Sequence, residues 1–334
     1  MMEAAYTLYA SHFVATGYNN ELHSDVTQTT GKPMTLNNRA LGGLLALACG
    51  DALANGVEFS PRGSSEITDM HSTRRYLPVG QWSDDTGLAL CLAESLVRTN
   101  GFDPADQMRR YAGFYDRKEG WPCELALTSG NTLGAALKKF KDTGEAFSGS
   151  THPLAAGNGG LMRLLPVVLA AHLDTARVRL WAREATRTTH GAQECLEASE
   201  LLALILHHLL LGEDKSDALS AAADQAWQST KILALARGEY LNKPETLIRA
   251  KSYVVDTLEA ALWCFASTSS LESALLTAAN LGDDCDTVAA VTGQLAGCHY
   301  GIKAIPEGWL NVLVGKRRIE TLAKRLIDMT PQGE

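Results

Sequence analysis

Apolar residues at helical spacing dominate the chain from residue 39 onward. Alanine and leucine recur three and four positions apart in the segments LGGLLALACGDAL, GLALCLAESLVR, LLALILHHLLL, DTLEAALWCFA and DTVAAVTGQLAGCHYG, which is the spacing of an α-helix. Several of these segments are apolar on every side, which indicates burial in a core. Alternating β-branched patterns are almost absent. We therefore predict an all-α protein of about a dozen helices, joined by Gly-, Asp- and Pro-containing loops.

The helical part of the chain shows no Pro-, Gly- or Ser-rich linker and no repeat of fixed period. A length of 334 residues would suit two domains, but the continuous helical pattern predicts one compact, orthogonal multi-helix bundle over residues 37–334. Residues 1–36 are rich in Thr, Asn, Gly and Tyr and have weak periodicity. We interpret them as an N-terminal extension, which is either a partner-binding segment or a simple terminal tail.

Composition and charge narrow the possible partners and compartment. The chain is 46% hydrophobic and carries a formal net charge of −8, so nucleic acid and anionic membranes are not expected partners. The seven cysteines form no C-x-x-C pair, a usage typical of reduced, buried thiols in a cytoplasmic protein. No secretory signal pattern opens the chain, and its longest apolar run falls short of the ~20 residues that a membrane helix needs.

Two acidic turns precede two of the apolar segments. The first acidic turn, residues 83–86, reads SDDT, and the second acidic turn, residues 283–287, reads DDCDT. One Asp, Ser or Thr is enough to cap a helix, and capping alone is one reading of either turn. Two or three carboxylates packed together repel each other unless a cation neutralises them, and neither turn has a Lys or Arg nearby in the sequence. A divalent metal site is therefore the favoured interpretation.

The side chains of the acidic turns offer only hard oxygen donors. These favour Mg²⁺ or Mn²⁺, with Ca²⁺ as an alternative. Several carboxylates are enough for two ions spaced roughly 3.5–4 Å apart, with Asp84 and Asp286 as bridging ligands. Glu58 follows the apolar helix that ends in Gly50 and Asp51. Taken alone, Glu58 is either an ordinary exposed loop acid or a third contributor to this site.

A glycine-rich segment and one histidine are further candidates for ligand binding. Asn158, Gly159 and Gly160 stand directly before a predicted helix, with Arg163 in its first turns. Glycines allow close backbone approach, and a helix N-terminus binds phosphate; the alternative is a plain loop-to-helix joint. His190 lies at a break between two predicted helices, where it either contacts a sugar hydroxyl, acts in proton transfer, or caps a helix.

Five segments together resemble one enzyme family. GDALANGVEF, WSDDTGLAL, GNGGLMRLLPVVL, THG and NLGDDCDTVAAVTGQLAG occur in the order and spacing of the ADP-ribosylglycohydrolase family, over roughly residues 37–330. Bacterial members of that family include the dinitrogenase reductase-activating glycohydrolase. The resemblance implies an all-α fold with a binuclear Mg²⁺ centre, Mn²⁺ in some members. It also implies hydrolysis of the bond between ADP-ribose and a modified group.

The resemblance also implies roles for individual residues. The implied metal ligands are Ser83, Asp84, Asp85, Asp284, Asp286 and Thr287. The implied catalytic carboxylates are Glu58, Asp84 and Asp85. The implied substrate-binding residues are Asn158, Gly159, Gly160, Met162 and Arg163 along the pyrophosphate and ribose path, and His190 at the ribose. Asp283 and Cys285 depart from the family's usual GGDxDT turn, without removing an implied ligand.

Two functions follow as predictions. The first is a Mg²⁺-dependent hydrolase that removes ADP-ribose from a protein side chain, arginine being favoured, through a metal-activated water with Glu58 or Asp85 as the base. The second is an immunity protein that blocks an ADP-ribosyltransferase toxin through residues 1–36, with or without hydrolase activity. The intact set of implied ligands argues for an enzyme.

Overall fold

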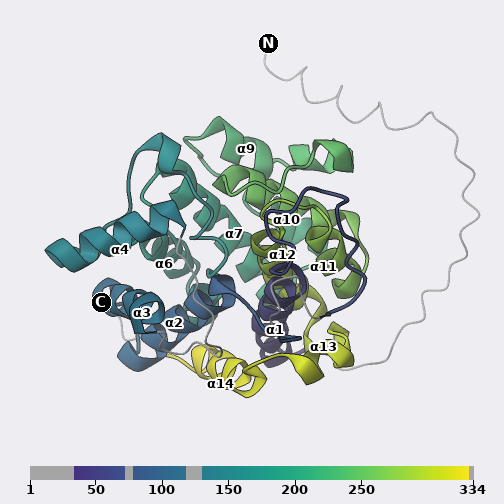
Figure 1. Cartoon of the computed structure of the whole chain (residues 1–334). Helices are drawn as coiled ribbons and strands as arrows, with labels where there is room; N and C mark the ends of the chain where they lie inside the picture. Colours follow the sequence, from purple (N-terminus) through teal and green to yellow (C-terminus); the bar gives the residue numbers. More distant parts are fainter. Residues whose placement is uncertain (1–33, 72–77, 118–129, 331–334) are drawn as a thin grey trace, which may run out of the picture. The chain divides into compact units, whose positions relative to one another are not determined.

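The computed structural model describes residues 34–71, 78–117 and 130–330, and the regular secondary structure of these ranges is helical (Figure 1). No strand occurs in these ranges, and only three isolated β-bridges link loops. The prediction of an all-α fold is confirmed. The helices are α1 (Leu36–Ala54), α2 (Asp84–Thr99), α3 (Pro104–Arg117), α4 (Asn131–Thr143), α5 (Leu165–Ala171), α6 (Thr175–Arg187), α7 (Gln193–Leu211), α8 (Lys215–Ser220), α9 (Thr230–Ala236), α10 (Val254–Ser267), α11 (Leu271–Ala279), α12 (Cys285–Tyr300), α13 (Glu307–Val312) and α14 (Lys316–Ile327), with 3₁₀ helices at Pro153–Ala155, Glu239–Asn242, Glu245–Leu247 and Ile302–Ala304.

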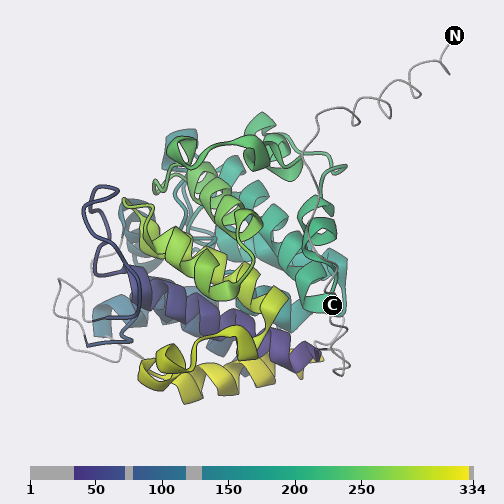
Figure 2. The same cartoon turned by 90° about the vertical axis from the view of Figure 1, so that its right-hand side faces the viewer.

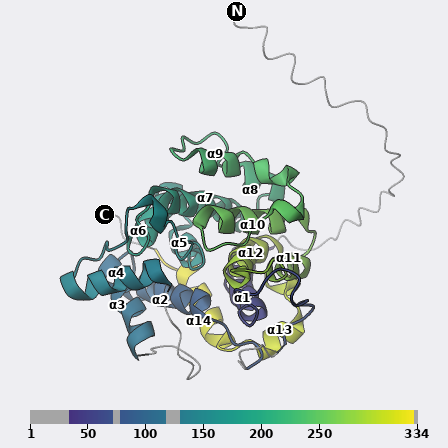
Figure 3. The ribbon, with the colours of Figure 1, turned by 45° about the horizontal axis from the view of Figure 1, so that its top comes forward.

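Helices α1 and α12 pack antiparallel and in close backbone contact (Figures 2 and 3). A Cβ added at Gly50 would lie 2.2 Å from the carbonyl oxygen of Ala289, and one at Gly42 would lie 2.4 Å from that of Gly297. Both distances are shorter than any side chain tolerates, so glycine is required for this approach. The pairing places the C-terminal end of α1, which carries Asp51, beside the N-terminal end of α12.

The helices predicted to be apolar on every side form the core. Helices α1, α7 and α12 are buried along most of their length, as their patterns predict. Helix α14 is amphipathic: Ile319, Leu322 and Leu326 are buried, whereas Arg317 and Arg325 are exposed. None of the helices in the described ranges is both long and apolar enough to cross a membrane.

The cysteines of the described residues are free and buried, as the sequence predicts. Burial raises the pKa of the Cys49 and Cys298 thiols to about 12, so they stay protonated and unreactive. Cys123 lies outside the described residues. The thiols of the core therefore serve as small apolar side chains.

Candidate active site

The residues predicted to form the site converge on a pocket of about 1310 Å³. Its walls come from the loop after α1, the starts of α2 and α12, the loop before α5, and the start of α7. Asp286, Gly160 and Arg163 are absent from the lining. Carboxylate oxygens of Asp286 nevertheless lie within 4.8 Å of those of the lining residues Asp85 and Asp284. The sequence-predicted residues that line the pocket are Glu58, Ser83, Asp84, Asp85, Asn158, Gly159, Met162, His190, Asp284 and Thr287.

The first acidic turn does not cap its own helix. Ser83 is the N-cap residue of α2, but its side chain makes no capping hydrogen bond. The cap comes from α1: the Asp51 carboxylate accepts from the Ser83 N–H at 2.8 Å, the Thr86 N–H at 3.0 Å and the Thr86 hydroxyl at 2.7 Å. These bonds satisfy amide groups that a helix start otherwise leaves unpaired. Asp84 and Asp85 are thereby left to face the pocket.

Asp51 is the residue that sequence reasoning underrated. It is fully buried, and its partners lie 32 and 35 positions further along the chain. The available signal was a charged residue inside a helix that is otherwise apolar on every side, since a buried carboxylate needs partners. The sequence does not identify those partners.

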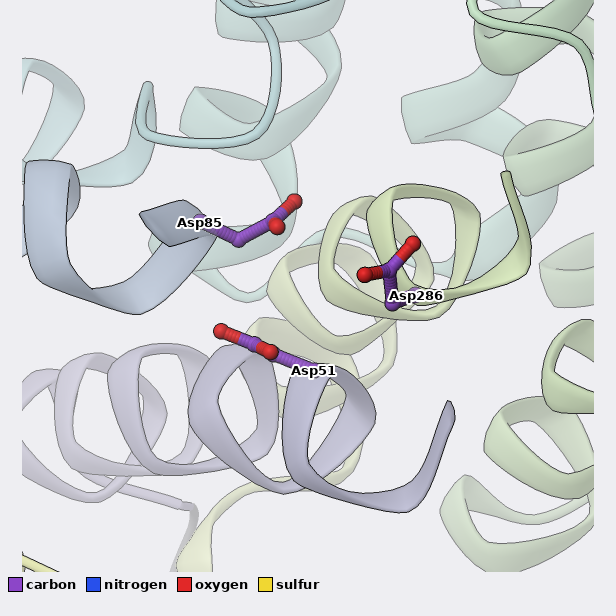
Figure 4. Close-up of side chains that lie close together, drawn as sticks. All are labelled: Asp51, Asp85 and Asp286. Atoms are coloured by element: carbon purple, nitrogen blue, oxygen red, sulfur yellow. The ribbon is translucent and has the colours of Figure 1, made fainter. Parts of the chain in front are cut away.

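Three helices bring three carboxylates together (Figure 4). Asp51 from α1, Asp85 from α2 and Asp286 from α12 are all buried, and one oxygen of each lies within 4.8 Å of the others. Glu58, Asp284 and Asp286 form a second group within the same distance. Asp286 belongs to both groups, so the five carboxylates form two adjoining clusters of oxygen donors.

Burial disfavours the charged forms of Asp51, Asp85 and Asp286, and repulsion from neighbouring carboxylates adds to this effect at Asp85 and Asp286. Burial, followed by the charge of Asp51, raises the pKa of Asp85 well above its usual value. Burial, followed by the charges of Asp85 and Glu58, does the same for Asp286. Burial raises the pKa of Asp51 to about 6, although hydrogen bonds from Thr86 and Ser83 oppose the shift. Oδ1 of Asp85 is buried without a hydrogen-bond partner. A buried carboxylate oxygen is normally paired with a cation or a hydrogen-bond donor, so this atom is available as a ligand.

Asp84 lies in neither carboxylate group. It lines the pocket, and its Oδ2 accepts a hydrogen bond of 2.6 Å from the Tyr115 hydroxyl. Burial raises the pKa of Asp84, which the Tyr115 hydrogen bond opposes. Its predicted role as a bridging ligand therefore stays a prediction, whereas the shared position that such a role requires is held by Asp286.

The second acidic turn is supported mainly by its backbone and by Asn158. The Asp284 N–H donates to the Ala250 carbonyl at 2.8 Å, and its Oδ2 accepts from Asn158 Nδ2 at 3.0 Å. Asn158, predicted to bind substrate, therefore also orients a carboxylate. Asp283 forms an ion pair with a lysine that lies 32 positions earlier in the chain. Lys251 Nζ lies 2.6 Å from Asp283 Oδ1, and both side chains are substantially exposed.

The glycine-rich segment differs from its predicted form. Helix α5 begins only at Leu165, so Gly159 and Gly160 do not stand directly before it, and Arg163 lies in the preceding turns rather than in the helix. The glycines serve close packing: an added Cβ at Gly159 would lie 2.7 Å from His190 Cε1, and one at Gly160 would lie 2.6 Å from Thr186 Cγ2. The predicted start of the helix directly after Gly160 is therefore wrong, whereas the role of this segment along the pyrophosphate path stays a prediction.

Arg163 and His190 are buried neighbours with different surroundings. The Arg163 guanidinium donates to the Thr189 hydroxyl and stacks 4.4 Å from the Tyr111 ring centre. His190 lies between α6 and α7, as predicted, and lines the pocket. Its Nδ1 lies 2.8 Å from the Thr189 hydroxyl, and burial, followed by the Arg163 charge, lowers its pKa to about 3. His190 is therefore neutral and suited to hydrogen bonding rather than to carrying charge.

An all-α fold that concentrates strongly perturbed carboxylates in one large pocket has the features of an enzyme rather than of a scaffold. The family model described as ADP-ribosylglycohydrolase matches residues 32–334. The chain belongs to the ADP-ribosylglycohydrolase family, and it is accordingly an ADP-ribosyl hydrolase.

Several relatives support this assignment. ADP-ribosylarginine hydrolase Tri1 of Serratia proteamaculans is 36% identical, over 89% of this chain and 81% of the relative; that of Pseudomonas putida is 38% identical, over 88% and 79%. ADP-ribosyl-[dinitrogen reductase] glycohydrolase of Rhodospirillum rubrum is 30% identical, over 88% and 96%. A solved structure, an ADP-ribosylglycohydrolase-related protein complex, is 41% identical with a TM-score of 0.78, over 88% of this chain and 98% of that one.

Proposed function

We propose that this protein hydrolyses the N-glycosidic bond between ADP-ribose and protein arginine side chains, using two Mg²⁺ ions, or Mn²⁺, held by the acidic turns. The observation that carries the proposal is the position of Asp286 in two adjoining carboxylate groups. The specificity for arginine rests on the two relatives that are ADP-ribosylarginine hydrolases.

The residues present fit divalent cations on chemical grounds. The donors are carboxylate and hydroxyl oxygens, which Mg²⁺ and Mn²⁺ prefer. The partnerless Oδ1 of Asp85 and the raised pKa values of Asp85 and Asp286 are the signs of a site that needs positive charge. Bound ions would neutralise these carboxylates and lower the pKa of water beside the substrate. The residues that would hold them are Asp51, Glu58, Asp85, Asp284 and Asp286, with Ser83, Asp84 and Thr287 at the same wall of the pocket.

Glu58 is the better placed of the two candidate bases. It is only partly buried and lines the pocket next to Asp284, whereas Asp85 accepts a hydrogen bond of 2.9 Å from the Ser83 hydroxyl. In the proposed reaction the water oxygen forms a bond to the anomeric carbon of the ribose and gives a proton to Glu58 as the bond to the guanidino nitrogen breaks. The arginine side chain leaves as a neutral guanidine and takes up that proton. Neutral His190 offers a hydrogen bond to a ribose hydroxyl, and Asn158 holds Asp284 in place.

The direct test is release of ADP-ribose from an arginine-linked protein substrate, with Mg²⁺ and with EDTA. We expect release with Mg²⁺, loss of release in EDTA and recovery on adding back Mg²⁺ or Mn²⁺. Asp84→Ala, in the pocket, should lose activity, whereas Asp142→Ala, an exposed carboxylate of α4 outside the pocket, should not. Full turnover in excess EDTA would contradict the metal requirement. Cleavage of a serine-linked substrate but not of the arginine-linked one would contradict the proposed specificity for arginine.

A second function is motivated by the residues ahead of the family match, which begins at residue 32. We propose that the N-terminal extension, residues 1–36, contacts an ADP-ribosyltransferase toxin, in a cytoplasmic immunity role. The truncation should stop before Met34, because the Thr35 side chain accepts from the Asn38 N–H and caps α1. Residues 34–334 should hydrolyse normally but fail to inhibit the transferase; equal inhibition by both forms would contradict this role.

A further inference from the structure

We propose that Phe59 and Leu154 form an apolar rim that docks the polypeptide segment carrying the modified arginine, Phe59 being the main contact. This inference rests on the proposed function and adds to it a residue that selects protein-bound over small substrates. The two side chains line the same pocket as the carboxylate groups.

Both rim side chains are large, apolar and open to solvent. Phe59 is 65% exposed and Leu154 is 92% exposed. Single exposed apolar residues are common on protein surfaces, and Leu173, 75% exposed, is one that lies away from the pocket. The rim is different because its exposed apolar surface adjoins a site that must accept a polypeptide-linked ligand.

The backbone at Phe59 is held in a conformation that does not suit a bulky residue. Its φ is +59°, in the left-handed region that aromatic side chains avoid and glycine adopts freely. Burial of the ring in the core does not explain why phenylalanine occupies this position, since the ring is mostly exposed. An outlier of this kind beside a reactive carboxylate, Glu58, points to a function for the ring.

The strained segment is clamped rather than loose. The Phe59 N–H donates to the Asp283 carbonyl, and the Asp283 N–H donates to the Ser60 carbonyl at 2.8 Å. The Arg62 guanidinium donates to three backbone carbonyls, those of Leu281, Glu245 and Ile248, at 2.8, 2.9 and 2.6 Å. The clamp ties the backbone of Phe59 to the second acidic turn, so the residue that carries the ring is held beside Glu58 and Asp284.

The occupant follows from the size and charge of the site. A pocket of about 1310 Å³ exceeds the ~300–1,000 Å³ typical of small-molecule sites, which leaves room for more than a nucleotide sugar. In the proposed function Glu58 is the base at the bond that breaks, and Phe59 is its neighbour in the chain and in the pocket lining, so we infer that the polypeptide carrying the arginine lies against the Phe59 ring. The exposed ring of Phe59 and the exposed side chain of Leu154 offer apolar contact to the residues that flank the modified arginine, and a small substrate lacks these residues.

The test compares two substrates on the same variants. One is an ADP-ribosylarginine-modified protein and the other is ADP-ribosylagmatine, which carries the same linkage without a polypeptide. Phe59→Ala should lower the ratio of kcat/KM for the protein to kcat/KM for the small substrate about tenfold, the loss expected for truncating one aromatic contact residue. Leu154→Ala should lower the ratio less, Phe59→Tyr should preserve it, and the control Leu173→Ala should leave both values of kcat/KM at wild-type level.

Two further arms separate docking from backbone effects and from failure of the proposed function. Phe59→Gly removes both the ring and the backbone strain. If the ring docks the polypeptide, Phe59→Gly must lower the ratio of the two kcat/KM values as Phe59→Ala does. A ratio at the wild-type level for Phe59→Gly overturns the proposal. An equal fall for both substrates also overturns it, because Phe59 then acts only through the Glu58 loop. If the wild type cleaves neither substrate, the proposed function fails. Binding then decides: Phe59→Ala must weaken the Kd of the modified protein more than that of ADP-ribose.

Discussion

The two acidic turns have nearly the same sequence pattern, yet the fold supports them by different means. The first, at α2, depends on one buried side chain, the Asp51 carboxylate, which bonds to both Ser83 and Thr86. The second, at α12, depends on backbone hydrogen bonds to Ala250 and Ser60. The first turn should therefore be sensitive to the chemistry of a distant residue, and the second to backbone conformation.

The two turns also differ in their exposure to solvent. Asp85 of the first turn is buried with a partnerless oxygen. Asp283 of the second is ion-paired with Lys251 at the surface, where such a pair contributes little to stability. Of the carboxylates in the two turns, only the buried ones should therefore control metal binding and catalysis. Asp286 is the residue that the two carboxylate groups share.

The largest effect is expected where the turns meet. Asp286→Asn should reduce ADP-ribose release at least a hundredfold, since it alters both carboxylate groups. The same change should raise the Tm of the metal-free protein, because it removes a buried charge from a repelling cluster. The measurements are turnover and thermal unfolding, each with Mg²⁺ and with EDTA.

A matched control for Asp286→Asn is Asp106→Asn. Asp106 is equally buried, but it is bonded to Arg110 at 3.0 Å and to the Ser95 hydroxyl at 2.9 Å. Its replacement should lower Tm and spare turnover. A lower Tm for metal-free Asp286→Asn would contradict the expectation. It would mean that the carboxylates at the centre of the site do not repel one another, and that Asp286 stabilises the fold as the ion-paired Asp106 does.

The next largest effect concerns the first turn alone. With Mg²⁺ present, Asp51→Ala should destabilise the protein by about 1–3 kcal/mol, because the N–H groups of Ser83 and Thr86 lose their partner. It should also lower turnover at least tenfold, because Asp51 would help to hold a cation and also positions the start of α2, which carries Asp85. Chemical denaturation and amide hydrogen exchange check this. Exchange should quicken at the start of α2 and not at α12; equal quickening at both would show that the supports are not independent.

The pH dependence of the metal-free protein is the third expectation. Asp51 has a folded pKa of about 6 against an ordinary 3.8, and those of Asp85 and Asp286 are also raised. These three carboxylates therefore bind more protons in the folded state than in the unfolded state, so the stability that they contribute at low pH is lost as pH rises from about 4 through 6 and above. His190, whose folded pKa is lowered, contributes in the opposite direction below about pH 6.5. The loss should amount to roughly one to a few kcal/mol by pH 8.

Mg²⁺ should oppose this loss, since ligands bind metal in their deprotonated form. Denaturation from pH 5 to 8, with EDTA and with Mg²⁺, should show a stabilisation by Mg²⁺ that grows with pH. Asp286→Asn should flatten both dependences. A stability difference between the metal-free wild type and Asp286→Asn that stays constant across this range would contradict the expectation.

The smallest effect is expected at the exposed residue of the second turn. Asp283→Gly relieves a φ of +54° but loses the surface ion pair with Lys251 and adds freedom to the unfolded chain. These terms largely cancel, so the free energy of unfolding should change by less than about 1 kcal/mol. Denaturation and turnover of this variant check the expectation. A large loss of turnover would assign Asp283 a direct part in the site.

Much of the helical fold was predictable because its signals are local. The apolar spacing of α1, α7 and α12 identified buried helices, and Glu58 was placed correctly in the loop after α1. The start of α5 was not predictable in the same way: the turns at residues 160–163 are shaped by packing of Gly159 and Gly160 against His190 and Thr186. Backbone contact with another segment leaves no periodic pattern.

The sequence by itself determined the helices, the two acidic turns and the kinds of oxygen donor that they offer, since each depends on residues within a few positions of one another. The tertiary structure alone decided which carboxylates meet, that Asp51 caps α2, and that Phe59 is held at the rim. These features join residues from 32 to more than 200 positions apart. The glycine-lined pairing of α1 with α12 brings Asp51 to Asp286, the contact of α1 with α2 brings Asp51 to Ser83, and the bridge of Ser60 with Asp283 holds the segment at Phe59. All three contacts are properties of the packed fold.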